Sequence, residues 1–201
     1  LNSMIKFNIK LVCGCKVKKR ILVTGADGFI GKPMCEKLAQ ENEVFALLVK
    51  DCPGPWNAAV IADLVKDEID LSAVAPIDII IHLAGKAHAV SEVGEGNEYF
   101  AINTDGTRKV LEAAKQISVR RFVFFSSVKA MGEGSHEAED EQTPCRPSGP
   151  YGQSKLDAEK LVLNGDFVPE PIVLRPSMVY GPTDKGNLPR MIKMISKGLF
   201  M

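Results

Sequence analysis

The sequence predicts an α/β fold built on a doubly wound parallel sheet. Three observations lead to this expectation. Short apolar runs that suit buried strands alternate with segments of helical periodicity along the 201 residues, an order typical of parallel α/β sheets. A glycine-rich turn joins the first of these strands to the first helix. Glycine and small polar residues directly follow several other strands, at the sheet edge where such folds bind ligands.

The glycine-rich turn lies within residues 21–31, which run Ile-Leu-Val-Thr-Gly-Ala-Asp-Gly-Phe-Ile-Gly. Gly25 can leave the strand with a φ that other residues avoid. Gly28 removes a side chain where a pyrophosphate would approach the backbone, and Gly31 lets the helix pack closely against the sheet. The N–H groups and positive dipole at the start of this helix favour a diphosphate. The turn therefore predicts a dinucleotide site, and the alternative is an ordinary structural turn.

The other elements are predicted from their hydrophobic patterns. The run from Val44 to Val49 is almost entirely apolar, which is typical of a parallel strand buried on both faces. Apolar residues at helical spacing from Val110 to Ile117 give the helix after Asn103 a buried face. The remaining strands are expected over 58–63, 77–85, 122–125 and 172–174, and the helices after Gly31 and over 104–117, 150–163 and 188–199.

Two segments fall outside this alternation. Residues 132–149 are rich in Gly, Pro, Ser and acidic side chains, and so long a connection predicts either a functional lid or a solvated loop. Residues 1–19 are basic, and a solvated extension without assigned role is favoured over a nucleic-acid or membrane arm. The chain thus divides into this extension, a dinucleotide-binding catalytic domain over 20–176, and a last region over 177–201.

Composition argues against several classes of protein. The formal net charge is zero and 45% of the residues are hydrophobic, so neither disorder nor a nucleic-acid partner is expected. No apolar run approaches the roughly 20 residues of a membrane span, and the first residues lack the apolar core of a signal peptide. The five cysteines form no disulfide-like framework, and Cys13-Gly14-Cys15 is too short for the usual zinc pair. We expect a cytoplasmic protein without a metal site.

Polar residues at the strand ends bear on the choice of cofactor. An acidic residue after the second strand would bind the adenosine ribose 2′-OH of NAD, whereas a basic one would accept the 2′-phosphate of NADP. The pair Lys50-Asp51 leaves the choice between NAD and NADP open, with Lys50 favouring NADP slightly. Asp63 suits either the adenine amino group or a turn cap. His82 alone predicts a core histidine, but Ala84-Gly85 after it suggests that the backbone approaches a ligand.

Three side chains suggest acid–base chemistry. Tyr151 and Lys155 are four residues apart on one face of a helix. An ammonium group beside a phenol favours the phenolate and so lowers a pKa that is normally about 10. Ser127, after the strand over 122–125, could hydrogen-bond the same substrate oxygen. Each residue alone would suit an ordinary surface, but together with the glycine turn they predict a catalytic site.

A set of motifs occurs in one order along the chain: Thr24-Gly25-x-x-Gly28-x-x-Gly31, His82-Leu83-Ala84-Gly85, Asn103, Ser126-Ser127, Tyr151-x-x-x-Lys155, Arg175-Pro176 and Tyr180-Gly181-Pro182. This set resembles the extended short-chain dehydrogenase/reductases. Within them it is similar to the NAD-dependent epimerase/dehydratase group, which acts on nucleotide-diphosphate sugars. The resemblance covers residues 20 to about 200 and implies a Rossmann fold.

The resemblance also implies roles. Tyr151 would be the acid and base, Lys155 would bind the nicotinamide ribose and lower the phenol pKa, and Ser127 would orient the sugar 4-oxygen. The glycines would cradle the pyrophosphate, Asp63 would contact the adenine, and Pro176 with Ser177 would lie against the nicotinamide. The implied substrate-binding residues are Lys86, Ser127, Val128, Lys129, Tyr151 and Asn187. The implied cofactor-binding residues are Gly25, Asp27, Gly28, Phe29, Ile30, Gly31, Lys50, Asp63, Leu64, Leu83, Ala84, Gly85, Asn103, Ser126, Tyr151, Lys155, Pro176 and Ser177.

Two departures from the family pattern narrow the function. Sugar 4,6-dehydratases carry an Asp-Glu pair where this chain has Val128-Lys129, so dehydration is disfavoured and 4-epimerases and 4-keto reductases remain. The run 126–129, together with 185–187, resembles a bacterial subgroup acting on 2-acetamido sugars. Family members usually run much longer, so the chain resembles a truncated member that lacks most of the smaller C-terminal substrate domain.

The leading hypothesis is an NAD(P)-dependent nucleotide-diphosphate-sugar 4-epimerase that acts on a UDP-linked 2-acetamido sugar. The first alternative is an NADPH-dependent nucleotide-sugar 4-keto reductase, and the second is an inactive dinucleotide-binding fragment. The expected partner is a nucleotide-diphosphate sugar, with no nucleic acid and no membrane span. By analogy with the family, the full-length protein would be a homodimer that pairs through the helices over 104–117 and 151–164.

Overall fold

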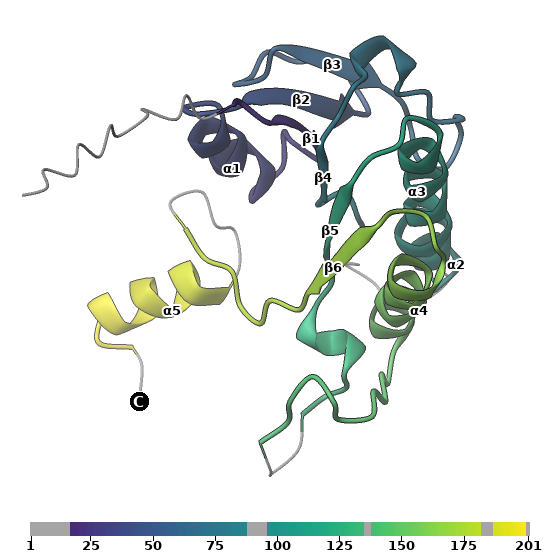
Figure 1. Ribbon diagram of the computed structural model, residues 1–201. Helices are drawn as coiled ribbons and strands as arrows, with labels where there is room; N and C mark the ends of the chain where they lie inside the picture. Colours follow the sequence, from purple (N-terminus) through teal and green to yellow (C-terminus); the bar gives the residue numbers. More distant parts are fainter. Residues whose placement is uncertain (1–16, 88–95, 135–137, 182–186, 200–201) are drawn as a thin grey trace, which may run out of the picture.

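The computed structural model describes residues 17–87, 96–134, 138–181 and 187–199. Its centre is a six-stranded sheet with the order β3-β2-β1-β4-β5-β6, in which each neighbouring pair is parallel. This arrangement confirms the predicted doubly wound sheet (Figure 1). The strands are β1 (Arg20–Thr24), β2 (Glu43–Leu48), β3 (Ala58–Ile61), β4 (Ile79–His82), β5 (Arg121–Phe125) and β6 (Glu170–Leu174).

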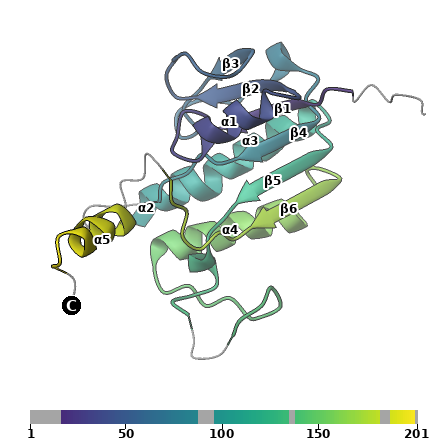
Figure 2. The ribbon, with the colours of Figure 1, turned by 90° about the vertical axis from the view of Figure 1, so that its left-hand side faces the viewer.

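The described helices are α1 (Gly31–Leu38), α2 (Gly96–Tyr99), α3 (Gly106–Gln116), α4 (Pro150–Asn164) and α5 (Asn187–Ser196). In Figure 1, α1 covers one face of the sheet, and α3 and α4 cover the other. Figure 2 shows α5 projecting away from this body. None of the helices within the described residues has the length and apolar content needed to cross a membrane.

The core has two parts, one on each face of the sheet. Side chains alternate along β1, so that Leu22 packs in the larger core beneath α3 and α4, whereas Ile21 and Val23 pack in the smaller core beneath α1. The smaller core also contains Cys35 of α1. Because neighbouring residues of one strand are buried on opposite faces, the central strands are apolar along their whole length.

Two predicted strands are shorter in the structure, because their last residues bond elsewhere. The third strand ends at Ile61, and the Asp63 N–H beyond it donates to the carboxylate of Asp67 over 2.8 Å. The fourth strand spans residues 79–82. Beyond it, the Ala84 N–H donates to the Thr24 hydroxyl over 3.1 Å, so a side chain rather than a strand carbonyl accepts this bond. Both strands lose their last predicted residues at the carboxyl edge of the sheet, and the fourth strand also starts two residues later than predicted.

The helix predicted over 104–117 begins earlier than expected. α2 leads into α3 through a π-helical segment, Phe100–Asp105, in which the Gly106 N–H donates to the carbonyl of Ala101. Asn103 therefore lies inside a helical run rather than just before a helix. This wider turn is the kind of local irregularity that often accompanies a functional site.

Two predicted segments lie partly outside the described residues. Of the N-terminal extension, residues 1–16 are outside them, and residues 17–19 are exposed. Within the predicted loop over 132–149, residues 138–149 form turns and irregular backbone up to the start of α4. The lid function suggested for this loop stays a prediction.

Candidate active site

The glycine turn has the geometry that its sequence predicts. Gly25 has a φ of +64°, which places it in the left-handed region that favours glycine. A Cβ atom on Gly31 would lie 2.1 Å from the carbonyl oxygen of Gly25, and one on Gly28 would lie 3.1 Å from the same oxygen. The turn therefore leaves no room for a side chain at Gly31, and α1 starts directly against the sheet.

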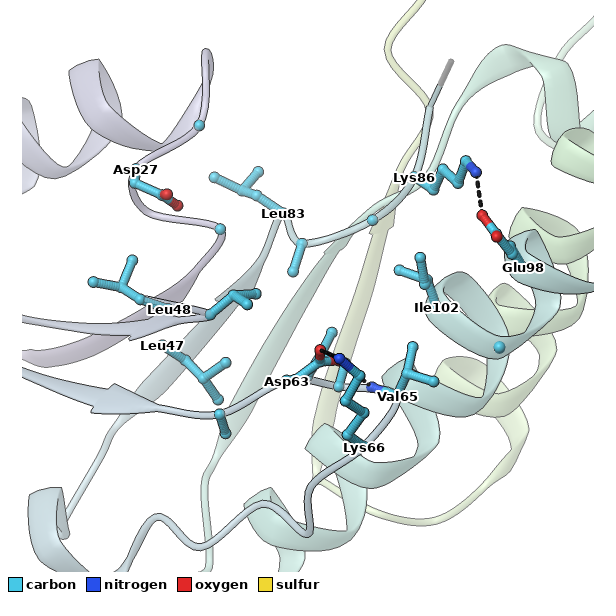
Figure 3. Close-up of a pocket in the computed structure, with 18 residues that line it drawn as sticks. Asp27, Leu47, Leu48, Asp63, Val65, Lys66, Leu83, Lys86, Glu98 and Ile102 are labelled. Carbon is cyan, nitrogen blue, oxygen red and sulfur yellow. Dashed lines mark hydrogen bonds and ion pairs between the residues drawn. The ribbon is translucent and has the colours of Figure 1, made fainter. Parts of the chain in front are cut away.

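A cavity of about 680 Å³ opens beside this turn, at the carboxyl ends of β1, β2 and β4 (Figure 3). Its volume is within the range of small-molecule and cofactor sites. Its lining includes nine of the predicted site residues: Gly25, Gly28, Asp27, Asp63, Leu64, Leu83, Ala84, Gly85 and Lys86. The lining includes none of the three predicted catalytic residues, Ser127, Tyr151 and Lys155. The other predicted site residues outside it are Phe29, Ile30, Gly31, Lys50, Asn103, Ser126, Val128, Lys129, Pro176, Ser177 and Asn187.

Of the two residues predicted to lie near the adenosine, Lys50 and Asp63, only Asp63 lines the cavity. Lys50 is exposed and lies outside the lining of the cavity. The Asp63 carboxylate lies in the cavity wall, accepts the Val65 N–H over 2.9 Å and faces Lys66 over 3.6 Å. The Val65 hydrogen bond, ahead of the other contributions, holds the pKa of Asp63 below its usual value. Asp63 thus caps a turn, and its carboxylate also borders the cavity.

Tyr151 lies in the first turn of α4, which starts with Pro150 at its first helical position. The phenol interacts with the side chain of Ser127, and its ring centroid lies 5.8 Å from that of Tyr99. Burial raises the pKa of Tyr151; the interaction with Ser127 opposes this rise, and Tyr99 adds to it. The pKa of Tyr151 is thus raised and not lowered in this geometry, and the contribution that opposes the rise comes from Ser127, whereas the sequence led us to expect it from Lys155.

Lys155 is buried one helical turn beyond Tyr151. Its ammonium group donates to the carbonyl of Phe125 over 2.8 Å and lies 4.6 Å from the ring centroid of Phe124. Burial lowers the pKa of Lys155 to about 8, and Glu159 opposes this shift. Glu159 is 2% exposed, and its two carboxylate oxygens accept from Arg175 over 2.9 and 2.5 Å. Lys155 is thus held as a cation at neutral pH beside a buried ion pair.

The buried ammonium group predicts a specific dependence of stability on pH. Relative to a Lys155→Met variant, the wild-type chain should gain stability as the pH rises from about 8 to 10.5. In that window the unfolded chain binds more protons at Lys155 than the folded chain, so the cost of burying the charge disappears. Urea unfolding of both proteins at several pH values measures this difference. A difference that stays constant across the window would contradict the assigned burial.

The end of β4 approaches Lys155 closely. A Cβ atom on Gly85 would lie 2.9 Å from Oδ1 of Asn103 and 3.4 Å from Nζ of Lys155. Asn103 is fully buried, accepts the Lys86 N–H over 2.8 Å and donates to the Lys86 carbonyl over 3.0 Å. Asn103 therefore holds the loop after β4 against the helices, and Gly85 lets this loop come close to Lys155.

The predicted substrate residues have other contacts in the structure. Val128 and Lys129 belong to a short 3-10 turn after β5, Val128–Ala130, in which the Lys129 N–H donates to the hydroxyl of Ser127. The ammonium group of Lys129 pairs with Glu133, and that of Lys86 pairs with Glu98. The Val128 N–H donates to the carbonyl of Pro176, next to Ser177, over 3.2 Å. Asn187 begins α5, and its side chain lies outside the described part of the structure.

Sequence reasoning missed three residues at this site. Tyr99 packs against Tyr151, Lys66 faces Asp63, and Glu159 holds Arg175. Tyr99 and Tyr151 are 52 positions apart, so no local pattern could pair them. The spacing of Lys155 and Glu159, at i and i+4 on one helix, is the signal that could have indicated Glu159.

Three features of this sheet edge fit a dinucleotide. The cavity has a suitable volume, and the glycine turn beside it is closed to side chains. Among the described residues, the hydroxyl of Ser126 is buried without a hydrogen-bond partner, and such an atom suits a polar ligand. The fold and this edge define a dinucleotide-binding α/β protein of the Rossmann type, with a Ser–Tyr–Lys group beside the cofactor edge.

The chain belongs to the NAD dependent epimerase/dehydratase family, whose model matches residues 21–199. It is 31% identical over 206 residues to the UDP-glucose 4-epimerase of Vibrio cholerae, with 92% of this chain and 59% of that protein covered. It is 29% identical to the N-acetyl-α-D-glucosaminyl-diphospho-ditrans,octacis-undecaprenol 4-epimerase of Escherichia coli O157:H7, with 90% and 55% covered.

A solved structure of MoeE5 in complex with UDP-glucuronic acid and NAD has a TM-score of 0.76 and 29% identity to this chain. The match covers 87% of this chain and 60% of MoeE5. The chain thus spans between about half and three fifths of the length of the relatives it matches.

Proposed function

We propose that the chain provides the cofactor-binding and acid–base part of a nucleotide-diphosphate-sugar 4-epimerase that acts on a UDP-linked 2-acetamido sugar. One observation supports this most directly: Tyr151 interacts with Ser127 one helical turn from buried Lys155, and Gly85 of the cavity wall approaches Lys155 so closely that a Cβ atom on it would lie 3.4 Å from Nζ. Val128-Lys129 leaves no carboxylate pair for dehydration. The names of the Vibrio and Escherichia relatives, both 4-epimerases, are consistent with this choice.

We infer NAD rather than NADP as the cofactor. Lys50, which favours NADP in the sequence, lies outside the cavity lining, whereas the Asp63 carboxylate borders it. The Lys50 ammonium group is therefore not part of the cavity wall that would have to bind the 2′-phosphate of NADP. The MoeE5 structure contains NAD. The residues that would hold the cofactor are the glycines of the turn, Asp63, the loop over 83–85, Ser126, Lys155 and the Pro176-Ser177 pair.

In the proposed reaction the bound dinucleotide supplies one chemical function, the acceptance and return of the hydride from C4. Ser127 would hold the sugar 4-oxygen, and Tyr151 would take the 4-hydroxyl proton as the C4 hydrogen leaves. The positive charge of Lys155 would stabilise the phenolate once its bond to the Phe125 carbonyl is exchanged. After the 4-keto sugar has turned over, Tyr151 would return the proton to the 4-oxygen. Each cycle would thus leave cofactor and protein unchanged.

Tyr151→Phe tests this assignment. Because the variant keeps the ring but has no proton to transfer, turnover of UDP-N-acetylglucosamine is expected to fall by about 10²–10⁴-fold. The dissociation constant for NAD should change little. Product is measured by chromatography and NAD binding by calorimetry. Tyr180→Phe is the matched control, because Tyr180 is 69% exposed. Wild-type turnover in Tyr151→Phe would contradict the proposed mechanism.

The same assay separates the alternatives. A 4-keto reductase would consume NADPH in proportion to product, whereas an epimerase would need only catalytic NAD. A chain that binds NAD and converts no sugar would be the dinucleotide-binding fragment. We further propose that residues 20–176 form the catalytic domain, that 177–201 begin the substrate-binding region, and that the whole protein is a homodimer.

A further inference from the structure

Buried polar side chains connect the glycine turn to the catalytic helix. Thr24, the last residue of β1, and His82, the last residue of β4, lie side by side, with the Thr24 hydroxyl 2.7 Å from Nδ1 of His82. The other ring nitrogen, Nε2, lies 3.0 Å from the hydroxyl of Thr107 on α3. All three side chains are 0% exposed. His82 thus links two strand ends to a helix in the interior.

The direction of each hydrogen bond can be assigned from the donors available. The Thr107 hydroxyl donates its one proton to the carbonyl of Asn103 over 2.5 Å, so it accepts from Nε2–H of His82. Nδ1 then carries no proton and accepts from the hydroxyl of Thr24. The Thr24 oxygen accepts in turn from the Ala84 N–H. The His82 ring thus donates one hydrogen bond through Nε2–H and accepts one at Nδ1. This arrangement requires a neutral imidazole that is protonated on Nε2.

The connection continues to Tyr151. The side-chain amide of Asn103 donates to the Ser154 hydroxyl over 3.0 Å, and that hydroxyl donates to the carbonyl of Tyr151 over 2.8 Å. Ser154 is also 0% exposed. One unbroken path therefore runs from the residue before Gly25 to the backbone of Tyr151.

The surroundings of His82 keep it from serving as an acid or base. Its ring lies 5.6 and 5.7 Å from the rings of Phe122 and Phe124. Burial, together with the charge of Lys155, lowers the pKa of His82 to about 3. A ring that stays neutral can keep one donor and one acceptor in fixed directions at any physiological pH.

We propose that His82 is a positioning residue that couples the dinucleotide turn to the helix turn carrying Tyr151. It holds Thr24 beside Gly25 on one side and the Thr107–Asn103 pair on the other. A displacement of the turn on nucleotide binding would thereby be transmitted to Asn103, Ser154 and Tyr151, because each of them is held in this path by buried hydrogen bonds. That this coupling affects catalysis rests on the proposed function. The structural link between the glycine turn and the backbone of Tyr151 does not depend on it.

Variants at His82 separate the two arms of the path. His82→Phe keeps an aromatic ring between Phe122 and Phe124 but removes both hydrogen bonds. His82→Gln retains a donor near the position of Nε2, and His82→Asn retains an acceptor near that of Nδ1. Thr104→Val is the matched control, because the Thr104 hydroxyl donates to the carbonyl of Ser154 over 2.9 Å without belonging to the path.

The probe is ADP, which lacks the nicotinamide half and so has no group to reach Tyr151. We expect saturating ADP to slow amide hydrogen exchange in residues 151–155 by about fivefold or more in the wild type and in Thr104→Val. His82→Phe should bind ADP and lose this slowing, and His82→Gln or His82→Asn should keep part of it. Slowing that persists in His82→Phe, or that is absent in an ADP-bound wild-type chain, would overturn the coupling.

A second measurement needs no ligand. In ¹⁵N-histidine spectra of the free chain, with His82 identified by comparison with His82→Gln, the ring should remain neutral and protonated on Nε2 from pH 5 to 8. Its nitrogen shifts should change in Thr107→Val. A titrating ring, or one protonated on Nδ1, would overturn the inference even if His82→Phe did not fold. Calorimetry shows separately whether ADP binds, so a failed cofactor site is distinguished from a failed coupling.

Discussion

Gly31→Ala is expected to abolish measurable NAD binding and to destabilise the chain. The new Cβ would lie 2.1 Å from the carbonyl oxygen of Gly25 and 2.8 Å from Cα of Ala26. Both are backbone atoms that cannot swing aside, so either the turn or the start of α1 has to move. Overpacking of this kind typically costs about 1–3 kcal/mol, and a displaced helix start no longer directs its N–H groups at a diphosphate.

Urea denaturation measures the loss of stability, and calorimetric titration measures binding. Gly149→Ala is the matched control, because a Cβ there would meet no atom within 4 Å. As the N-cap of α4, Gly149 should tolerate alanine at a cost below about 1 kcal/mol and without loss of NAD affinity. A Gly31→Ala chain with wild-type stability and affinity would contradict the close packing of the turn.

Arg175→Met is expected to lower the free energy of unfolding by about 3–5 kcal/mol, because it leaves a buried charge without its partner. Glu159 is 2% exposed and receives hydrogen bonds from both Nε and Nη2 of Arg175. Replacing both residues, as in Glu159→Leu with Arg175→Met, should restore part of the loss, since an apolar pair of similar volume needs no partner, while Lys155 loses the favourable charge of Glu159. Urea unfolding of the single and double variants measures this recovery.

The control for this cycle is an exposed ion pair. Arg120 is 74% exposed and pairs with Glu170, which also receives Arg121. Arg120→Met should therefore change stability by less than about 1 kcal/mol. Equal losses in Arg175→Met and Arg120→Met, or a double variant no more stable than Arg175→Met, would show that the buried pair lacks the assigned role.

The features that could be predicted from sequence are those governed by neighbouring residues. Alternation along β1 and the apolar run of β2 follow from side-chain direction in a strand buried on both faces. The positive φ of Gly25 and the absence of room at Gly31 follow from one short turn. Side-chain alternation within a strand and the conformation of one turn are therefore enough to indicate the fold class and the edge of the sheet where the cofactor is expected.

The features that could not be predicted depend on residues brought together from distant parts of the chain. The side chain of Asn103, within the π-helical segment, bonds to the loop after β4 and to Ser154 of α4. These partners are distant in sequence, so the segment could not be predicted from its own residues. The pKa of Tyr151 is raised because folding buries the phenol, and sequence gives the neighbouring lysine but not the extent of burial. Lys50 likewise occupies the expected position in sequence yet lies outside the cavity lining.

Calorimetric titration of the chain with NAD and, in parallel, with NADP tests the central claim most directly, namely that the glycine turn and its cavity bind a dinucleotide. We predict one NAD per chain, weaker binding of NADP, and loss of both in Gly31→Ala. Binding of neither dinucleotide, or NAD binding that Gly31→Ala leaves unchanged, would contradict the assignment of this cavity as the cofactor site.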